Sequence, residues 1–307
     1  MANPFLLPNP SVVSFSGGRT SGYMLHRIIE AFGGRLPEWV RVIFCNTGKE
    51  RPETLDFVER CSQRWDVPIT WLEYRWEPGR HYFEEVDYAT ASHNGEPFRL
   101  AIEARGRAYL PNPVQRFCTA ELKVKTTNRF ARKKLGWDTY TNAIGLRGDE
   151  KARVLRIQRR SHVKREPSLF DDGFSATLRP PPGESTVFPL YESGNTVDDV
   201  MAFWSKAPFD LAVAQTEGNC DLCFLKSTKT LTAIMAKRPD LAEWWIRMEG
   251  LPFHSERREV PATFRNDRPT YAKLLAIAQG REAEPGWLWA DKDTGACGEI
   301  AECRCTD

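Results

Sequence analysis

The chain has 307 residues, of which 41% are hydrophobic, so it can bury one large core or one core with a smaller appendage. Its 43 Lys and Arg residues nearly balance its 41 Asp and Glu residues, which excludes a strong overall attraction to nucleic acid but leaves room for a local basic face. No stretch approaches the roughly 20 apolar residues of a membrane span, and the N-terminus lacks the pattern of a secretory signal. The sequence therefore predicts a soluble, cytoplasmic protein.

A glycine-containing turn stands between an apolar run and a helical pattern near the start of the chain. Val12, Val13 and Phe15 suit a buried strand, and the apolar spacing over residues 21–32 predicts a helix. Glycines in such a turn let the backbone approach a ligand, and the amides and dipole of the following helix favour an anion. Turns of this kind also occur in α/β proteins without a ligand. The phosphate-binding candidates are Ser14, Ser16, Gly17, Gly18, Arg19, Thr20 and Ser21.

A second and a third strand follow, with a helix between them. Residues 40–44 form an apolar run that delivers Asn46 and Thr47 to the carboxyl end of a strand, residues 54–65 have a helical pattern, and residues 69–74 are rich in β-branched and aromatic side chains. Strands that alternate with helices predict a doubly wound α/β fold with a parallel sheet, in which ligands bind at the carboxyl ends of the strands. Asn46 and Thr47 are therefore candidates for nucleotide contacts, although this segment could also cap the next helix.

The order of these elements resembles that of a known family. The family is the phosphoadenosine phosphosulfate (PAPS) reductase family, in the adenine-nucleotide α-hydrolase-like superfamily, whose loop binds pyrophosphate. The chain resembles it in having, in this order, a strand, a Ser-Gly-Gly-x-x-Ser loop, a helix, a strand ending in Asn-Thr-Gly, a helix and a strand. The resemblance implies an adenine nucleotide as ligand. Together with the charged pairs and prolines in the middle of the chain, it predicts a nucleotide-binding α/β domain over residues 1–158, a flexible linker over 159–190 and a smaller, mostly helical, cysteine-containing region over 191–307.

Residues 110–123 resemble the Arg-x-Cys-Thr-x-x-Leu-Lys segment of the same family. In the family this segment lies near the substrate end of the nucleotide site, and the iron-sulfur reductases carry a pair of cysteines there. Phe117 stands at the first position of that pair and leaves Cys118 at the second. Arg116 and Lys123 suit phosphate or sulfate oxygens, and as positive neighbours they predict a lowered pKa for the Cys118 thiol. Cys118 and Lys123 are therefore catalytic candidates.

A third segment, after a strand predicted over residues 139–144, resembles the family's Gly-x-Arg-x-x-Glu-x-x-Arg pattern. Gly145 keeps space open beside Arg147, whose guanidinium at the end of the strand suits a bidentate phosphate contact and a catalytic role. Asp149 and Glu150 are candidates to hold Mg²⁺ between phosphate oxygens, because this ion binds through few carboxylates and keeps its waters. Salt bridges at the start of a helix are the alternative for both acids.

Eight cysteines are too few for a disulfide scaffold in a chain of this length and point to metal or catalytic use for some of them. Cys220 and Cys223 form a Cys-x-x-Cys pair whose sulfurs can face one metal, although a redox dithiol or two core cysteines would share this spacing. The resemblance to iron-sulfur reductases favours an iron-sulfur cluster, with zinc as the alternative. Cys45 and Cys61 suit the core. The candidate metal ligands are Cys118, Cys220, Cys223, Cys303 and Cys305.

The family resemblance implies two reactions on this scaffold. An ATP-pyrophosphatase holds the β- and γ-phosphates in the loop while a substrate oxygen attacks the α-phosphorus, and sulfur then displaces the adenylate. A PAPS or adenylyl-sulfate reductase instead attacks an activated sulfate with a mobile C-terminal cysteine. The intact loop favours the first reaction, with a sulfur donor protein or small thiol and a nucleic acid as candidate partners, although Thr20 stands where many ATP-cleaving members carry aspartate. A non-catalytic nucleotide-binding protein with a structural zinc is the third interpretation.

Overall fold

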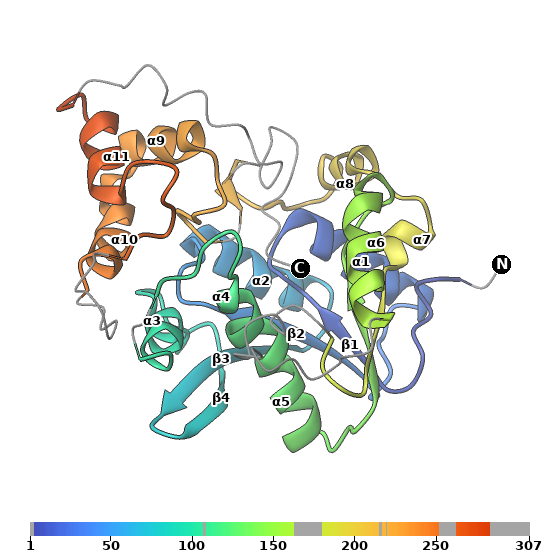
Figure 1. Cartoon of the computed structure of the whole chain (residues 1–307). Coiled ribbons are helices and arrows are strands. Elements are labelled where there is room, and N and C mark those ends of the chain that lie inside the picture. The colour runs from blue at the N-terminus through green and yellow to red at the C-terminus, as the bar shows by residue number, and fades with distance from the viewer. Residues whose placement is uncertain are drawn as a thin grey trace.

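A six-stranded sheet forms the centre of the N-terminal part of the chain, called the sheet half below. The structure is a computed structural model and describes residues 3–106, 109–162, 180–214, 217–218, 220–251 and 262–282. The strand order is β4-β3-β2-β1-β5-β6, and neighbouring strands are parallel except for the antiparallel pair β3 and β4 (Figure 1). This architecture confirms the doubly wound α/β class. The strands are β1 (Ser11–Ser14), β2 (Val40–Asn46), β3 (Ile69–Glu77), β4 (Arg80–Val86), β5 (Tyr140–Ile144) and β6 (Glu184–Val187).

Helices cover both faces of this sheet. None of those in the described ranges is both long and apolar enough to cross a lipid bilayer. The segment from α4 to α5 is one continuous helical stretch whose middle, η1, widens into π-helical turns. The helices associated with the sheet are α1 (Arg19–Ala31), α2 (Pro52–Arg64), α3 (Glu96–Glu103), α4 (Phe117–Thr119), η1 (Ala120–Lys125), α5 (Thr126–Lys133), η2 (Gly148–Glu150), α6 (Lys151–His162), α7 (Pro189–Glu192) and α8 (Val197–Trp204).

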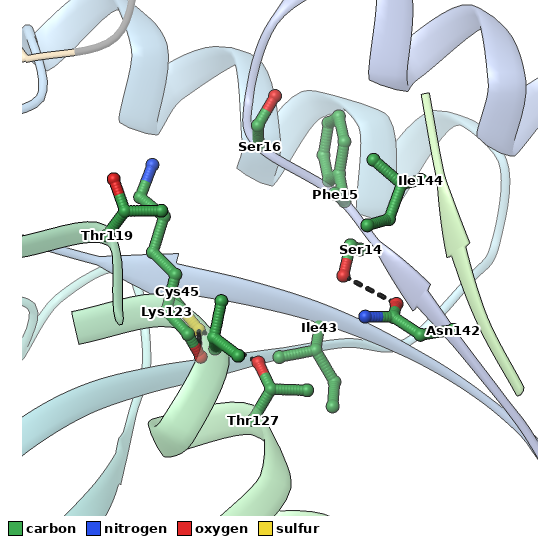
Figure 2. A pocket seen from close by; sticks show the side chains of 11 residues that line it. Ser14, Phe15, Ser16, Ile43, Cys45, Thr119, Lys123, Thr127, Asn142 and Ile144 are labelled. Atoms are coloured by element: carbon green, nitrogen blue, oxygen red, sulfur yellow. Dashed lines mark hydrogen bonds between the residues drawn. The ribbon is translucent and has the colours of Figure 1, made fainter. Parts of the chain in front are cut away.

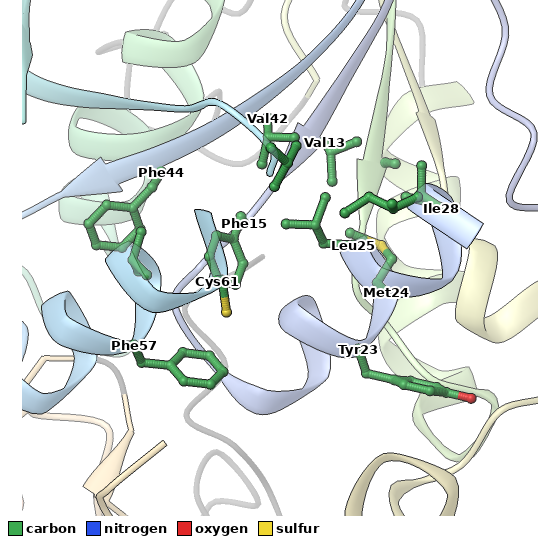
Figure 3. Close-up of a cluster of buried hydrophobic side chains, with 14 of the residues drawn as sticks. Val13, Phe15, Tyr23, Met24, Leu25, Ile28, Val42, Phe44, Phe57 and Cys61 are labelled. Atoms are coloured by element: carbon green, nitrogen blue, oxygen red, sulfur yellow. The ribbon is translucent and has the colours of Figure 1, made fainter. Parts of the chain in front are cut away.

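The central strands are buried on both faces, because consecutive residues of a strand point to opposite sides. On β1, Val13 belongs to an apolar cluster with Met24 of α1 and Phe57 of α2 (Figure 3). Its neighbour Val12 belongs to the cluster on the other face, with Phe130 of α5. Burial on both faces explains why these strands appear in the sequence as continuous apolar runs instead of alternating patterns.

A group of helices near the C-terminus stands beside the sheet (Figure 1). It contains α9 (Thr228–Lys237), the short turn η4 (Pro239–Leu241), α10 (Ala242–Glu249) and α11 (Tyr271–Ala278). Its core centres on Trp245, whose ring stacks on Tyr271 with centroids 5.2 Å apart and lies 4.9 Å from the ring of Phe264. Phe98 of α3 contacts the same tryptophan. The helical group therefore packs directly against the sheet half.

Two parts of the chain differ from the sequence prediction. Residues 75–110, for which the sequence analysis predicted no regular element, contain the edge strand β4 and the helix α3. Residues 184–187, assigned to a flexible linker, form β6 and pair with β5. The polar sequence of β6 concealed it, since a short edge strand does not need an apolar pattern. Helix α8 packs on α1 in the core of the sheet half, so that core extends beyond the boundary expected near residue 190.

Trp204 anchors α8 to this core. The side chain is 2% exposed, contacts the ring of Phe57 with centroids 5.0 Å apart, and donates from Nε1 to the carbonyl oxygen of Arg19 at 2.8 Å. We expect Trp204→Ala to lower the free energy of unfolding by about 3–5 kcal/mol, because it removes a large buried ring and leaves a cavity.

Chemical denaturation followed by circular dichroism measures this change. Met201→Ala is the matched control on the same helix, where the side chain is 37% exposed, and it should change the free energy by no more than about 0.5 kcal/mol. Equal effects of the two substitutions would contradict the assignment of α8 to the core of the sheet half.

Candidate functional site

A cavity opens at the carboxyl ends of β1, β2 and β5. The chain runs from β1 to β2 and β3 on one side and then crosses to β5 on the other, and ligands of doubly wound sheets bind at such a reversal. The cavity is small, with a volume of about 70 Å³, below the roughly 300–1,000 Å³ that is typical of small-molecule sites. Its lining residues are Ser14, Phe15, Ser16, Ile43, Cys45, Thr119, Lys123, Val124, Thr127, Asn142 and Ile144 (Figure 2).

The predicted phosphate loop forms a tight turn at the mouth of this cavity. The Ser16 amide donates to Ser21 Oγ at 3.2 Å, and the two hydroxyl oxygens are 3.0 Å apart. Gly17 has a φ of +76°, and a Cβ there would come within 2.8 Å of Thr54 Cγ2, so the backbone conformation and the space both require glycine. Amides in the first turn of a helix have no intrahelical acceptor. The turn can therefore present amides and hydroxyls of α1 to an anion.

The side chain of Arg19 turns away from the loop. Its guanidinium binds both carboxylate oxygens of Asp210, at 2.8 and 2.9 Å, and donates to the carbonyl oxygen of Val213 at 3.2 Å. A phosphate contact by Arg19 would therefore come from its backbone. No local sequence signal could have found Asp210, which lies 191 residues further along the chain.

The structure brings Arg147 to the loop. Its Nη1 donates to Thr20 Oγ1 at 3.0 Å, and its Nε and Nη2 both donate to Asp149 at 3.1 Å. The Arg147 amide and the Arg153 guanidinium bind the carboxylate of Glu150. The two acids predicted to hold Mg²⁺ are thus in ion pairs with arginines, which is the alternative that the sequence left open for them. Arg147 connects these pairs to the first turn of α1.

Gly145 lies where the end of β5 approaches the start of α1. A Cβ on Gly145 would stand 3.3 Å from the Cα of Ser21, tighter than almost all real contacts of this kind. The glycine therefore sets how closely β5 and the phosphate loop pack, which is a structural reason for its presence beside any contact with a nucleotide.

Asn46 and Thr47 shape the loop after β2. Asn46 donates to Glu73 at 2.5 Å and accepts from the Gly48 amide at 3.0 Å. The Thr47 hydroxyl donates to Glu50 at 2.8 Å. Within the described residues both side chains are buried in these contacts, beside the cavity instead of in its lining. A nucleotide contact by either residue stays a prediction.

The π-helical turns of η1 place Lys123 in the cavity wall. Figure 2 shows its side chain extending past Thr119 toward the level of Ser16. Such turns are frequent at functional sites. For Cys118, the expectation of a lowered pKa is wrong: burial raises the pKa of the thiol more than Arg116 and Lys123 lower it.

Cys220 and Cys223 are buried against the loop after β2. Cys220 forms an isolated antiparallel bridge with Glu50, and its Sγ lies 3.6 Å from the Thr47 hydroxyl. Both cysteines belong to the apolar cluster against which Cys118 packs. Among the described residues no three His, Cys, Asp or Glu side chains gather closely enough to hold a metal. The candidates Cys303 and Cys305 lie outside the described residues.

A polar network beneath the cavity was not predicted from the sequence. Ser14 Oγ donates to Asn142 Oδ1 at 2.8 Å, and Asn142 Nδ2 donates to Glu184 Oε1 at 2.9 Å. Burial raises the pKa of Glu184, although hydrogen bonds from Asn142, Tyr140 and Thr186 oppose the rise. The signal that could have revealed the network is an asparagine in the middle of the otherwise buried strand β5.

Gly17 and Gly33 offer a matched test of the loop geometry. Both have a positive φ, of +76° and +74°, but among the described residues nothing would lie within 4 Å of a Cβ on Gly33. We expect Gly33→Ala to cost about 1 kcal/mol of backbone strain, and Gly17→Ala to cost about 1–3 kcal/mol more through steric overlap. Urea unfolding of the two variants measures the difference, and equal midpoints would contradict the loop geometry.

Known proteins resemble this chain at three levels. The model of the phosphoadenosine phosphosulfate reductase domain matches residues 10–112. The nin region protein ORF290 of Escherichia phage lambda, itself uncharacterized, is 31% identical over 304 residues, which cover 95% of this chain and 94% of the phage protein. A third likeness is to the solved structure of the U34-tRNA thiolase NcsA from Methanococcus maripaludis with its 4Fe-4S cluster. The superposition covers 92% of this chain and 76% of the thiolase chain. With 13% identity and a TM-score of 0.38, this likeness is too distant to carry a conclusion. The chain therefore belongs to the same family as the phage protein, and its residues 10–112 match a phosphoadenosine phosphosulfate reductase domain.

Proposed function

We propose that the protein cleaves ATP between the α- and β-phosphates and so adenylates a substrate for sulfur transfer. The observation that carries the proposal is the tight Ser16 to Ser21 turn, which opens onto a small, mostly apolar cavity with Lys123 in its wall. This arrangement offers an anion site beside an apolar space. A pyrophosphate group would lie on the turn, with the rest of the nucleotide over the mouth of the cavity.

The turn and Lys123 would have different roles in the reaction. The β- and γ-phosphates would lie on the amides and hydroxyls of the turn, with the α-phosphate toward Lys123. An oxygen of the substrate attacks the α-phosphorus, the bond from that phosphorus to the β-phosphate oxygen breaks, and pyrophosphate leaves. The ammonium of Lys123 would stabilise the negative charge on the α-phosphate oxygens in the transition state. A sulfide-level sulfur, delivered by a donor protein or a small thiol, would then attack the adenylated carbon of the substrate. The carbon–sulfur bond forms, the bond from that carbon to the adenylate oxygen breaks, and AMP leaves.

A magnesium ion would add charge neutralisation to this site. Such an ion is held largely by phosphate oxygens and water. A direct contact with Asp149 or Glu150 would require the carboxylate to share or release its arginine partner, because Arg147 and Arg153 bind these two acids. Asp149 and Glu150 as ligands of Mg²⁺ therefore stay a proposal. The acceptor of the adenylate, with a nucleic acid as one candidate, is likewise proposed on the strength of the family resemblance alone.

Product analysis tests the central step. The metal-replete protein is incubated with sulfide and with ATP labelled at the α-phosphate, with and without total RNA or DNA as acceptor, and AMP and pyrophosphate are quantified. We expect both products, and we expect Lys123→Met to lower their rate of formation by about 100- to 1,000-fold, the usual cost of one transition-state donor. Lys134→Met is the matched control, because Lys134 lies away from the cavity and pairs with Glu85.

Three results would contradict the proposal. Release of inorganic phosphate without AMP would mean cleavage at the wrong bond. An unchanged rate of AMP and pyrophosphate formation in Lys123→Met would mean that Lys123 has no role in the reaction. Consumption of PAPS with release of sulfite would instead support the reductase alternative, which the match to the PAPS reductase domain keeps in view.

The cysteines are proposed to hold a metal centre near this site. Cys220 and Cys223 supply two buried thiols, Cys118 packs against the same apolar cluster, and Cys303 and Cys305 are the further candidates. Soft thiolate ligands suit an iron-sulfur cluster or zinc. A cluster bound by these residues would supply a Lewis-acidic or sulfur-carrying iron centre.

Anaerobic purification with an absorbance spectrum and iron and zinc analysis tests the metal centre. We expect a broad band near about 400 nm, typical of iron-sulfur clusters, that disappears in Cys220→Ala and persists in Cys61→Ala. Cys61 is the control because it is buried in the other apolar core. A colourless protein with stoichiometric zinc would contradict the cluster and make these cysteines structural.

A further inference from the structure

One buried lysine holds the turn that carries Cys220 and Cys223. Lys226 follows the second cysteine by three residues and is fully buried. Its ammonium donates to the carbonyl oxygen of Cys220 at 3.0 Å and to that of Gly218 at 2.7 Å. Its backbone amide donates to the carbonyl oxygen of Cys223 at 2.9 Å. Lys226 therefore binds the backbone of both cysteines.

Full burial is unusual for a lysine, because an ammonium that leaves water loses its hydration. A methionine of similar length would fill the same space without that cost, but it could not donate to the two carbonyl oxygens. What the ammonium of Lys226 adds at this position is a fixed course of the backbone from Gly218 to Cys223.

Two further contacts hold the same turn from the side of the helical group. The hydroxyl of Tyr271 donates to the carbonyl oxygen of Leu222, which lies between the two cysteines, at 2.6 Å. The guanidinium of Arg268 donates to the carbonyl oxygen of Lys226 at 2.8 Å. All of these contacts are made by the protein itself, so the protein alone determines the form of the turn.

The chemistry of the turn fits a metal ion that prefers sulfur. It carries two thiols three residues apart, and soft sulfur ligands select ions such as zinc or iron. Cys118 packs against the same apolar cluster. A turn that is fixed in advance loses less conformational freedom on binding than a flexible one, so it binds more tightly.

We propose that Lys226 is a positioning residue, which holds Cys220 and Cys223 ready for a metal ion and so raises their affinity for it. Lys226 acts through the backbone of the two cysteines and does not bind the metal, since an ammonium has no lone pair. The inference rests on the part of the proposed function that gives these cysteines a metal. It does not depend on the reaction with ATP.

Anaerobic titration with Co²⁺ tests the inference without any turnover, because thiolate ligands give bound Co²⁺ a charge-transfer absorbance. The full chain is freed of metal with a chelator before the titration. We expect Lys226→Met to lower the affinity for Co²⁺ by about 10- to 100-fold, the usual cost of losing a group that orients metal ligands. Lys229→Met is the matched control, because Lys229 is exposed, and its affinity should equal that of the original protein.

Tyr271→Phe keeps the test decisive if Lys226→Met does not fold. This variant keeps the ring that stacks on Trp245 and removes the hydroxyl that donates to Leu222. We expect it to lower the affinity for Co²⁺ about three- to tenfold, the usual contribution of one neutral hydrogen bond. Circular dichroism establishes which variants are folded.

The outcomes distinguish this inference from the proposed metal centre. An unchanged affinity for Co²⁺ in folded Lys226→Met would overturn the inference and leave the metal centre standing, and so would an equal loss in Lys229→Met. If Lys226→Met is unfolded, an unchanged affinity in Tyr271→Phe overturns the inference. Failure of the original protein to show the charge-transfer absorbance with Co²⁺ would overturn the metal centre and this inference together.

Discussion

The close packing of the turn between β1 and α1 is the constraint on which the site depends. Gly17 places this turn against α2, and Gly145 lets the end of β5 approach the same turn from the other side. The Arg19 pair with Asp210 then fixes the start of α1 from outside the cavity. Because the turn is held on three sides, its amides and hydroxyls keep their positions before any ligand arrives. Such preorganisation is what phosphate binding and catalysis by positioning require.

A second connection joins Cys220 and Cys223 to the half of the chain that contains the sheet. Lys49, in the loop after β2, forms a buried ion pair of 2.8 Å with Asp221, which also accepts from the Trp245 indole at 2.8 Å. The Asp221 amide donates to the Lys49 carbonyl oxygen at 2.7 Å. A buried pair with additional hydrogen bonds holds its partners in one geometry. Cys220 and Cys223 are therefore held against the loop that follows β2, at the edge of the sheet where the nucleotide is proposed to bind.

The sequence predicted the fold where local patterns reflect burial, as in the apolar runs of β1 and β2, and it predicted the phosphate loop from the residues of a single turn. It missed β6 because a short polar edge strand lacks an apolar pattern. It could not assign the guanidinium of Arg19 to Asp210, because that pair depends on the packing of α8. It predicted a lowered pKa for the Cys118 thiol from neighbouring charges, whereas burial, which depends on the tertiary structure, has the larger effect. The network from Ser14 to Glu184 joins three strands and has no counterpart in any one segment.

A crystal structure with α,β-methylene ATP, which cannot be cleaved between the α- and β-phosphates, tests the account most directly. The account predicts the β- and γ-phosphates on the Ser16 to Ser21 turn and the α-phosphate beside Lys123. Phosphates bound away from the turn, or an analogue bound at the opposite edge of the sheet, would contradict it.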